Sequence, residues 1–288
     1  MSKLIDYPAA TRFDSGDILI KDGMNGTKKI TAKNAAIDLA GMVSAVQHRM
    51  IWGGRNLGTS VTAEQKAAIR NGTFDNLYVG DYWVINGITW RIWDINYFTH
   101  SGDTEFAKPH LVIVPDSALY SHVMNDTNTT EGGYVGSKMY KEGLEQAKTT
   151  IKAAFGDMLL THRDYLTNAV TDGHASAGAW FDSQVELMNE IMAYGTHVYA
   201  PANDGVTLPN KYTTGRQQFA AAMLNPSIVS LRYWYWLRDV VSSAYFAIAD
   251  DNRAATIFKH LFCNWRFRDK IVAVEFQVAD NSTISKCN

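Results

Sequence analysis

Cysteine is scarce in this chain of 288 residues, which contains two, Cys263 and Cys287. Two thiols are too few for a disulfide framework or for a zinc site built on cysteine. The sequence also lacks an uninterrupted apolar run of the ~18 residues that a membrane span needs, and residues 1–6 lack the apolar core of a secretion signal. We therefore expect a protein that is made in the cytoplasm and does not insert into a membrane.

An excess of charge of either sign is missing as well. The formal net charge of -2 gives no electrostatic reason to expect nucleic acid or an anionic membrane as a partner. With 46% hydrophobic and 19% charged residues, the composition is that of an ordinary globular protein. Aromatic residues make up 12% of the chain and suit either a core or a contact surface.

Patterns that bind metal or perform catalysis are also missing. The eight histidines show no His-x-x-x-His spacing and no arrangement that places three ligands on one element, so we expect neither a metal nor a cofactor. His162-Arg163-Asp164 is interpreted as a helix start with a local charge pair. The adjacent carboxylates of Asp250 and Asp251 would point apart at a strand end.

The N-terminal region, residues 1–53, combines a predicted hairpin with a predicted helix. Two extended segments, 17–21 and 28–31, flank a turn that contains glycine. Apolar residues then alternate at spacings of four and three, as in the seam of a coiled coil. These residues are Ala32, Ala36, Leu39, Val43, Val46 and Met50. The seam indicates a trimerising or docking element, and a helix that packs on its own domain fits about as well.

Residues 54–288 are predicted to form one α+β domain. Thr62 to Gln65 is a capping-box pattern that opens a short helix, and Gly72 can close it. Asn86-Gly87 joins two extended segments, 82–85 and 88–93, as a hairpin turn.

Further elements of this domain follow from apolar content and spacing. Residues 110–114 are predicted to be a buried strand, and residues 271–278 have the apolar content of a closing strand. Helices are predicted at 144–155, 162–169 and 183–194. A loop is predicted at 200–215.

One stretch, Tyr233 to Asp239, places four large rings beside an arginine and an aspartate. Successive rings suit a strand with both faces covered, and a buried arginine needs a carboxylate, so Arg238 and Asp239 are interpreted as a buried pair that orients this strand. An extended segment of small and apolar residues, 240–249, follows. Residues 250–269 then show no consistent period.

The run from Tyr235 to Asp239 and the Ser-Ser-Ala-Tyr-Phe-Ala run at 242–247 resemble the variable proteins of phage diversity-generating retroelements. Three upstream phrases occur in a compatible order, at 79–83, 112–116 and 178–183. The resemblance, which runs from about residue 54 to 249, implies a C-type lectin fold of the formylglycine-generating-enzyme type. It also implies a ligand-binding face after the Trp-Leu-Arg segment, with side chains that vary on a fixed backbone.

By this resemblance the protein is a receptor-binding protein of a phage tail tip or fibre, made in the host cytoplasm and carried on the virion. We expect a homotrimer that binds a bacterial surface protein or glycan, contacts other tail proteins and is not an enzyme. The residues expected to contact the ligand are Tyr245, Asp250, Asp251, Asn252, Arg253, Thr256, Phe258, His260, Trp265 and Arg266. Two alternatives remain: a depolymerase of surface polysaccharide, with two carboxylates in a groove, and a purely structural virion subunit.

Overall fold

The computed structural model describes residues 18–21, 28–31, 45–99, 102–103, 106–201, 217–229, 234–249, 255–259 and 274–278. For residues 18–21, 28–31, 45–46, 167, 255–259 and 274–278 the backbone alone is described. The chain divides into two units, Met1–Ser44 and Ala45–Asn288.

The first unit contains the predicted hairpin. β1 (Ile18–Lys21) pairs with β2 (Lys28–Thr31) in antiparallel register, so that Ile18 lies opposite Thr31. The hairpin prediction is therefore confirmed. Of the predicted helix that follows, residues 32–44 lie outside the described residues.

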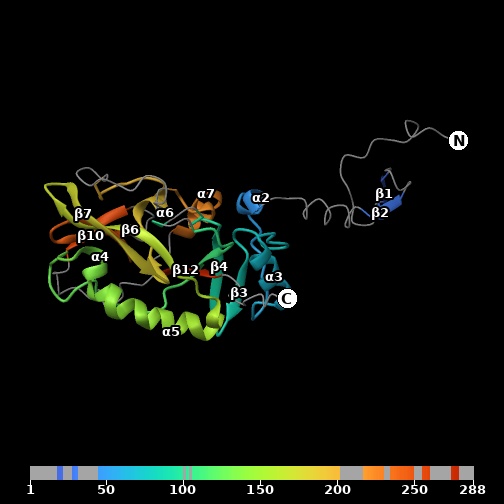
Figure 1. The fold of residues 1–288 in the computed structure, drawn as a ribbon, viewed down its shortest axis with the longest axis horizontal. Coiled ribbons are helices and arrows are strands. Elements are labelled where there is room, and N and C mark those ends of the chain that lie inside the picture. Colours follow the sequence, from blue (N-terminus) through green and yellow to red (C-terminus); the bar gives the residue numbers. More distant parts are fainter. Residues whose placement is uncertain are drawn as a thin grey trace. The chain divides into compact units, whose positions relative to one another are not determined.

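The second unit mixes short helices with antiparallel strands (Figure 1). Its helices are α2 (Ala45–Arg49), α3 (Ala63–Asn71), α4 (Gly133–Gly136), α5 (Leu144–Phe155), α6 (Glu190–Tyr194) and α7 (Ala220–Leu224), with a π-helical turn at Met139–Gly143 and 3-10 turns at Gly156–Met158 and Pro226–Val229. In the part of the chain that the structure describes, none of the helices has the length and apolar content to cross a membrane.

The strands form two sheets and a separate two-stranded ribbon. They are β3 (Tyr82–Ile85), β4 (Ile88–Ile95), β5 (Leu111–Pro115), β6 (His162–Thr171), β7 (His174–Ser183), β8 (Val185–Leu187), β9 (Tyr235–Ser242), β10 (Tyr245–Ala249), β11 (Ala255–Lys259) and β12 (Val274–Val278). The five-stranded sheet has the order β3-β4-β5-β12-β8, the three-stranded sheet has the order β11-β10-β9, and β6 pairs with β7. This architecture confirms the α+β class.

The larger sheet joins segments from both ends of the second unit. β12 lies between β5 and β8, with Phe276 opposite both Ile113 and Val185. The predictions of a buried strand near 110–114 and of a closing strand near 271–278 are both confirmed. Figure 1 shows α5 running along one side of these strands.

Local sequence signals account for several of these elements. Thr62 and Gln65 form the reciprocal capping box at the start of α3, and Gly72 ends that helix in the left-handed conformation. The turn between β3 and β4 has positive φ at both Asn86 and Gly87, as a type I′ hairpin turn requires. α5 buries a stripe of residues one turn apart, and its last member, Phe155, packs edge-on against Trp90.

Two helix predictions are wrong. Residues 162–169 belong to β6, where His162, Asp164 and Leu166 are buried in alternation, a period of two. In the segment 183–194, only Glu190–Tyr194 is helical, and Val185–Leu187 forms β8. A short apolar run fits a buried strand and a buried helix equally well, and pairing with β12 decides between them here. The loop predicted at 200–215 lies almost entirely outside the described residues.

Gly133 provides a test of how closely α4 packs on β6. Its φ is +67°, and an added Cβ would lie 2.5 Å from Cα of Asn168 and 2.6 Å from its carbonyl oxygen. We expect Gly133→Ala to lower the free energy of unfolding by about 3 kcal/mol or more, because two backbone segments would have to separate. Gly173, at φ +78° with open space around it, is the matched control, and Gly173→Ala should cost about 1–2 kcal/mol for the left-handed backbone alone. Equal losses in urea unfolding would contradict the close packing.

Candidate functional site

The aromatic strand predicted from Tyr233 to Asp239 is β9, and its first four residues are buried. The Tyr235 hydroxyl donates to the carbonyl of Val229 at 2.9 Å, and the Trp236 indole N–H donates to the carbonyl of His122 at 3.1 Å. Buried aromatic residues on both sides of a strand need such partners for their polar atoms. The prediction of a strand with both faces covered is confirmed.

Arg238 is the centre of a buried ion cluster that joins three strands. Its Nη2 donates to Oδ2 of Asp164 on β6 at 2.9 Å, and its Nη1 donates to Oε2 of Glu186 on β8. Arg238 is 6% exposed, Asp164 0% and Glu186 1%, so water screens this cluster little. Buried charges of this kind are tolerated only when each has a partner in good geometry.

Asp239 does not pair with Arg238, contrary to the prediction. Successive residues of a strand point to opposite faces, so neighbouring side chains cannot form a pair beneath one face. The carboxylates that Arg238 needs come instead from strands about 50 and 75 residues earlier in the chain.

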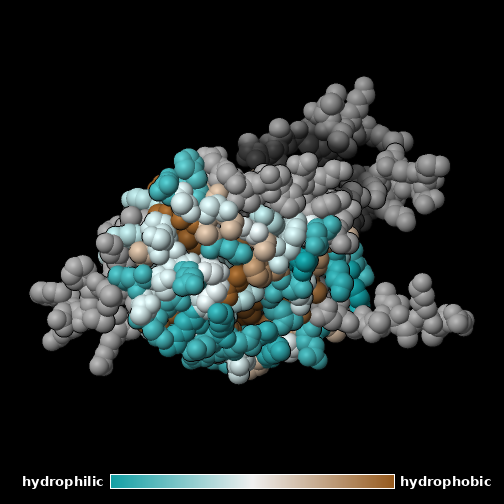
Figure 2. Space-filling model, turned by 60° about the vertical axis from the view of Figure 1, so that its left-hand side comes forward, coloured by the Kyte–Doolittle hydropathy of each residue, from teal (hydrophilic) through white to brown (hydrophobic). Residues whose placement is uncertain are grey.

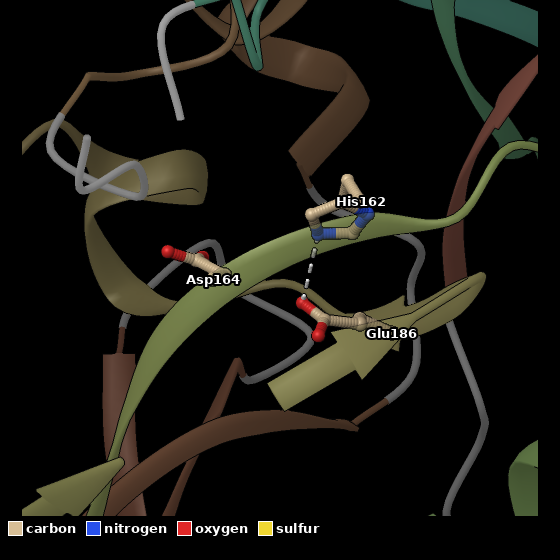
Figure 3. Close-up of side chains that lie close together, drawn as sticks. All are labelled: His162, Asp164 and Glu186. Atoms are coloured by element: carbon tan, nitrogen blue, oxygen red, sulfur yellow. Dashed lines mark ion pairs between the residues drawn. The ribbon is translucent and has the colours of Figure 1, made fainter. Parts of the chain in front are cut away.

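His162 lies at the edge of the same cluster (Figure 3). Its Nε2 is 3.7 Å from Oε2 of Glu186, and its ring lies 4.1 Å from the ring of Phe98.

The same side chains have the donor types of a divalent-cation site. One nitrogen of His162 and one oxygen each from Asp164 and Glu186 lie within 4.8 Å of one another. However, the guanidinium of Arg238 already contacts both carboxylates, so the protein's own cation holds this position. The members of this cluster come from β6 and β8, so a search for three ligands on one element could not find them.

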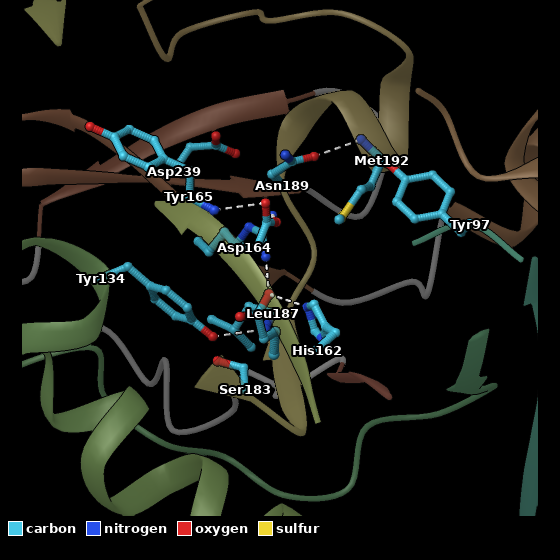
Figure 4. A network of polar contacts seen from close by, with 12 residues as sticks. Tyr97, Tyr134, His162, Asp164, Tyr165, Ser183, Leu187, Asn189, Met192 and Asp239 are labelled. Carbon is cyan, nitrogen blue, oxygen red and sulfur yellow. Dashed lines mark hydrogen bonds and ion pairs between the residues drawn. The ribbon is translucent and has the colours of Figure 1, made fainter. Parts of the chain in front are cut away.

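Asp239 faces the other side of β9, where it meets the start of α6 (Figure 4). Its Oδ2 accepts the N–H of Glu190 at 2.6 Å. Burial raises the pKa of Asp239 to about 7, and the negative charge of Glu190 adds to this effect, while the hydrogen bond from the Glu190 backbone and the charge of Arg238 oppose it.

The carboxylate of Glu190 fixes the segment after α6. It is fully buried and accepts the N–H groups of Val198 at 2.8 Å, Tyr199 at 3.0 Å and Ala200 at 3.0 Å. Three backbone donors on one carboxylate hold this turn in a single conformation. Val198 and Tyr199 are thereby presented at the surface, 48% and 44% exposed.

The strands that follow β9 carry the described part of the predicted ligand-contacting set. Tyr245 is partly buried at the start of β10, and the next four residues of that strand are buried. In the backbone register, Phe258 lies opposite Phe246 and Thr256 lies opposite Ile248, whereas Tyr245 lies opposite Lys259. Because strand residues alternate between faces, the predicted set is divided between two register faces.

The remaining predicted contact residues lie outside the described part of the chain. They are Asp250, Asp251, Asn252, Arg253, His260, Trp265 and Arg266.

The turn that leads into β10 is held by Thr130. Its N–H donates to the carbonyl of Ser243 at 3.1 Å, and its hydroxyl donates to the carbonyl of Ser242 at 2.6 Å. Thr130, which lies outside the three-stranded sheet, therefore holds the turn that precedes Tyr245.

Comparisons of the chain with protein-family models, curated proteins and solved structures returned no match. Inferences about function therefore rest on the residues of this chain alone.

Sequence reasoning missed Asp164, Glu186 and Glu190 as members of the site. One signal was present: Glu186 stands between Val185 and Leu187 in an apolar run, and a carboxylate at such a position needs a buried partner. Its partner could not be identified, because it lies 52 residues away in the sequence.

Removal of the central guanidinium tests the buried cluster. We expect Arg238→Met to lower the free energy of unfolding by about 3–5 kcal/mol at pH 7, because two buried carboxylates lose their partner. Arg163→Met is the matched control, since Arg163 also contacts two carboxylates, Asp103 and Asp182, but at the surface. Urea unfolding should show a much smaller loss for this control. Similar losses for the two variants would argue against a special role for burial.

Asp239 should make stability depend on pH. An ordinary aspartate ionises near pH 4. In the folded protein, where the pKa of Asp239 is about 7, the carboxyl keeps a proton that the unfolded chain releases between these values, so its contribution to stability falls as pH rises from about 4 to 7. Asp239→Asn cannot ionise, so its stability relative to wild type should rise between pH 5 and pH 8 in urea unfolding. A constant difference would contradict the raised pKa.

Proposed function

We propose that this chain is a receptor-binding protein of a phage tail tip or fibre, related to the variable proteins of diversity-generating retroelements and built on a C-type lectin fold of the formylglycine-generating-enzyme type. Its ligand is a bacterial surface protein or glycan, bound through the face that begins near Tyr245. Three copies in one virion fibre would multiply weak contacts through their high effective concentration. The other partners in this proposal are neighbouring tail proteins.

The order of the parts around β9 supports this proposal. A buried strand with rings on both faces is followed by a fixed turn and then by the antiparallel pair β10 and β11. Such an arrangement holds the backbone while the side chains beyond it are free to differ. A rigid support lowers the entropy cost of binding.

The observation that carries the proposal is that the charged groups beneath this face are buried and contact one another. Arg238 contacts both Asp164 and Glu186, and all three residues are at most 6% exposed. A catalytic acid or base must come within hydrogen-bond reach of a substrate. These groups are therefore suited to supporting a surface and not to reacting with a molecule bound on it.

A second candidate function is a depolymerase, and one observation favours it. Asp239 is partly buried and has a pKa of about 7, a value suited to acid–base work near neutral pH. Against this reading, the Asp239 carboxylate already accepts the N–H of Glu190. In the depolymerase reading the protein releases reducing sugar from host polysaccharide and Asp239→Asn abolishes that release, whereas a receptor-binding protein releases none.

Binding of the purified chain to a panel of intact bacterial cells tests the receptor-binding proposal. The test variant changes Tyr245, Asp250, Asn252 and Arg253 to alanine. The control variant changes four exposed residues of α5 to alanine: Glu145, Gln146, Thr149 and Lys152. Each set removes one carboxylate and one cation, so net charge is matched.

We expect the control to bind as wild type does and the folded test variant to lose at least about tenfold in affinity, as for changes at binding hot spots. Equal binding by both variants would contradict the location of the face. Failure of wild type to bind any strain would favour a structural subunit of the virion.

A further inference from the structure

The ribbon of β6 and β7 has an outer face that the proposed receptor-binding face does not include. Tyr165 lies directly opposite Trp180, and Arg163 lies directly opposite Asp182. Direct partners in an antiparallel pair share a face, so these four side chains are neighbours on one side of the ribbon. The other side carries His162, Asp164 and Leu166 of β6, which are buried.

The two rings of this outer face are held by the ribbon itself. Their centroids are 5.4 Å apart and their planes make an angle of 78°, an edge-to-face pair. Gly178 makes room for Tyr165, because an added Cβ would lie 2.6 Å from its Cε1. The tyrosine ring therefore lies over the bare backbone of β7. Both rings remain partly exposed, and unlike Phe181 neither packs against the hydrophobic core of the described residues.

A polar edge borders the rings. Arg163 donates from Nη1 to Oδ1 of Asp182 at 3.1 Å and from Nε to Oδ2 of Asp103 at 2.9 Å. The side chains of these three residues are 40–60% exposed. Two carboxylates against one guanidinium leave an excess of negative charge and of hydrogen-bond acceptors at the surface.

We propose that this outer face, the platform formed by Tyr165, Trp180, Arg163, Asp182 and Asp103, binds a neutral glycan. The C–H face of a hexose ring fits against an aromatic ring. The hydroxyls at its rim can donate hydrogen bonds to the carboxylates. Excess negative charge disfavours acidic sugars and nucleic acid. This inference goes beyond the receptor-binding proposal and does not depend on it.

The platform is fixed before any ligand arrives. Asp164 stands between Arg163 and Tyr165 in β6, and its side chain is held on the buried face by Arg238. Its second oxygen, Oδ1, accepts the N–H of Tyr165 at 2.9 Å. A binding surface whose backbone is fixed in this way loses little conformational entropy on binding.

The surface near β7, β10 and α4 is mixed in hydropathy. Figure 2 brings forward the side on which β7, β10 and α4 are labelled in Figure 1. White and pale residues lie there among teal residues and several brown, hydrophobic patches, and teal residues gather along the lower edge (Figure 2).

Titration calorimetry of the full chain with neutral oligosaccharides tests the proposal. The probes are hexamers of glucose, galactose and mannose, and hexagalacturonate is the acidic counterpart. Trp180→Ala removes a ring of the platform, and Asp182→Asn removes an acceptor charge while keeping the size of the side chain. Tyr199→Ala is the matched control, because it removes an exposed aromatic ring that is not a member of the platform. Thermal unfolding verifies that each variant is folded.

We expect at least one neutral hexamer to bind and hexagalacturonate to bind more weakly. Trp180→Ala should weaken the binding by at least about tenfold and Asp182→Asn by a smaller factor, while Tyr199→Ala leaves it unchanged. The proposal is overturned if no neutral hexamer binds, if the acidic probe binds best, or if Trp180→Ala and Tyr199→Ala bind alike. Should Trp180→Ala fail to fold, Asp182→Asn with unchanged affinity overturns it. The cell-binding variants at 245–253 leave the platform intact, so the two proposals fail separately.

Discussion

The guanidinium of Arg238 joins strands from three separate pairings: β9 of the three-stranded sheet, β6 of the ribbon and β8 of the five-stranded sheet. The strand pairings hold each of these groups together, and one further backbone bond, from the N–H of Arg238 to the carbonyl of Met188 at 2.9 Å, links β9 to the end of β8. Because an unpaired buried charge costs several kcal/mol, the three strands are stable only in the arrangement that lets Asp164 and Glu186 meet Arg238. The cluster thus stabilises the placement of these three groups of strands relative to one another. Because β10 pairs with β9, the start of the proposed receptor-binding face is placed together with them.

Buried carboxylates fix irregular segments elsewhere in the second unit by the same means. Asp94 accepts from the guanidinium of Arg49 and from the N–H of Ala220, which ties α2 and the start of α7 to β4. Glu190 fixes the turn at 198–200 through three N–H groups. Short helices and long connections bury little apolar surface, so directed hydrogen bonds to charged groups replace part of the packing.

The predictions from sequence succeeded where the signal was local. The capping box at Thr62, the Asn86-Gly87 turn and the stripe of α5 each involve residues within a few positions of one another. They failed at 162–169, which is a strand because it pairs with β7 across the turn at Asp172 and Gly173, a local hairpin signal that was overlooked. The partners of Arg238 were missed for a different reason: adjacency to Asp239 was visible in the sequence, whereas the contacts that bring Glu186 and Asp164 to Arg238 from 52 and 74 residues away were not. The lectin fold and the phage function rest on a resemblance and stay proposals.

The central claim is that the cluster around Arg238 holds the strands that support the proposed binding surfaces. Hydrogen exchange of wild type and Arg238→Met under native conditions tests this claim most directly. If the cluster does so, the variant should exchange faster in β6, β8, β9 and β10, with little change in α3 and in the hairpin of β3 and β4, because local opening would follow the strands that lose their ion partner. Exchange in β6, β8 and β9 that is unchanged, or that rises no more than in the β3–β4 hairpin, would contradict the claim.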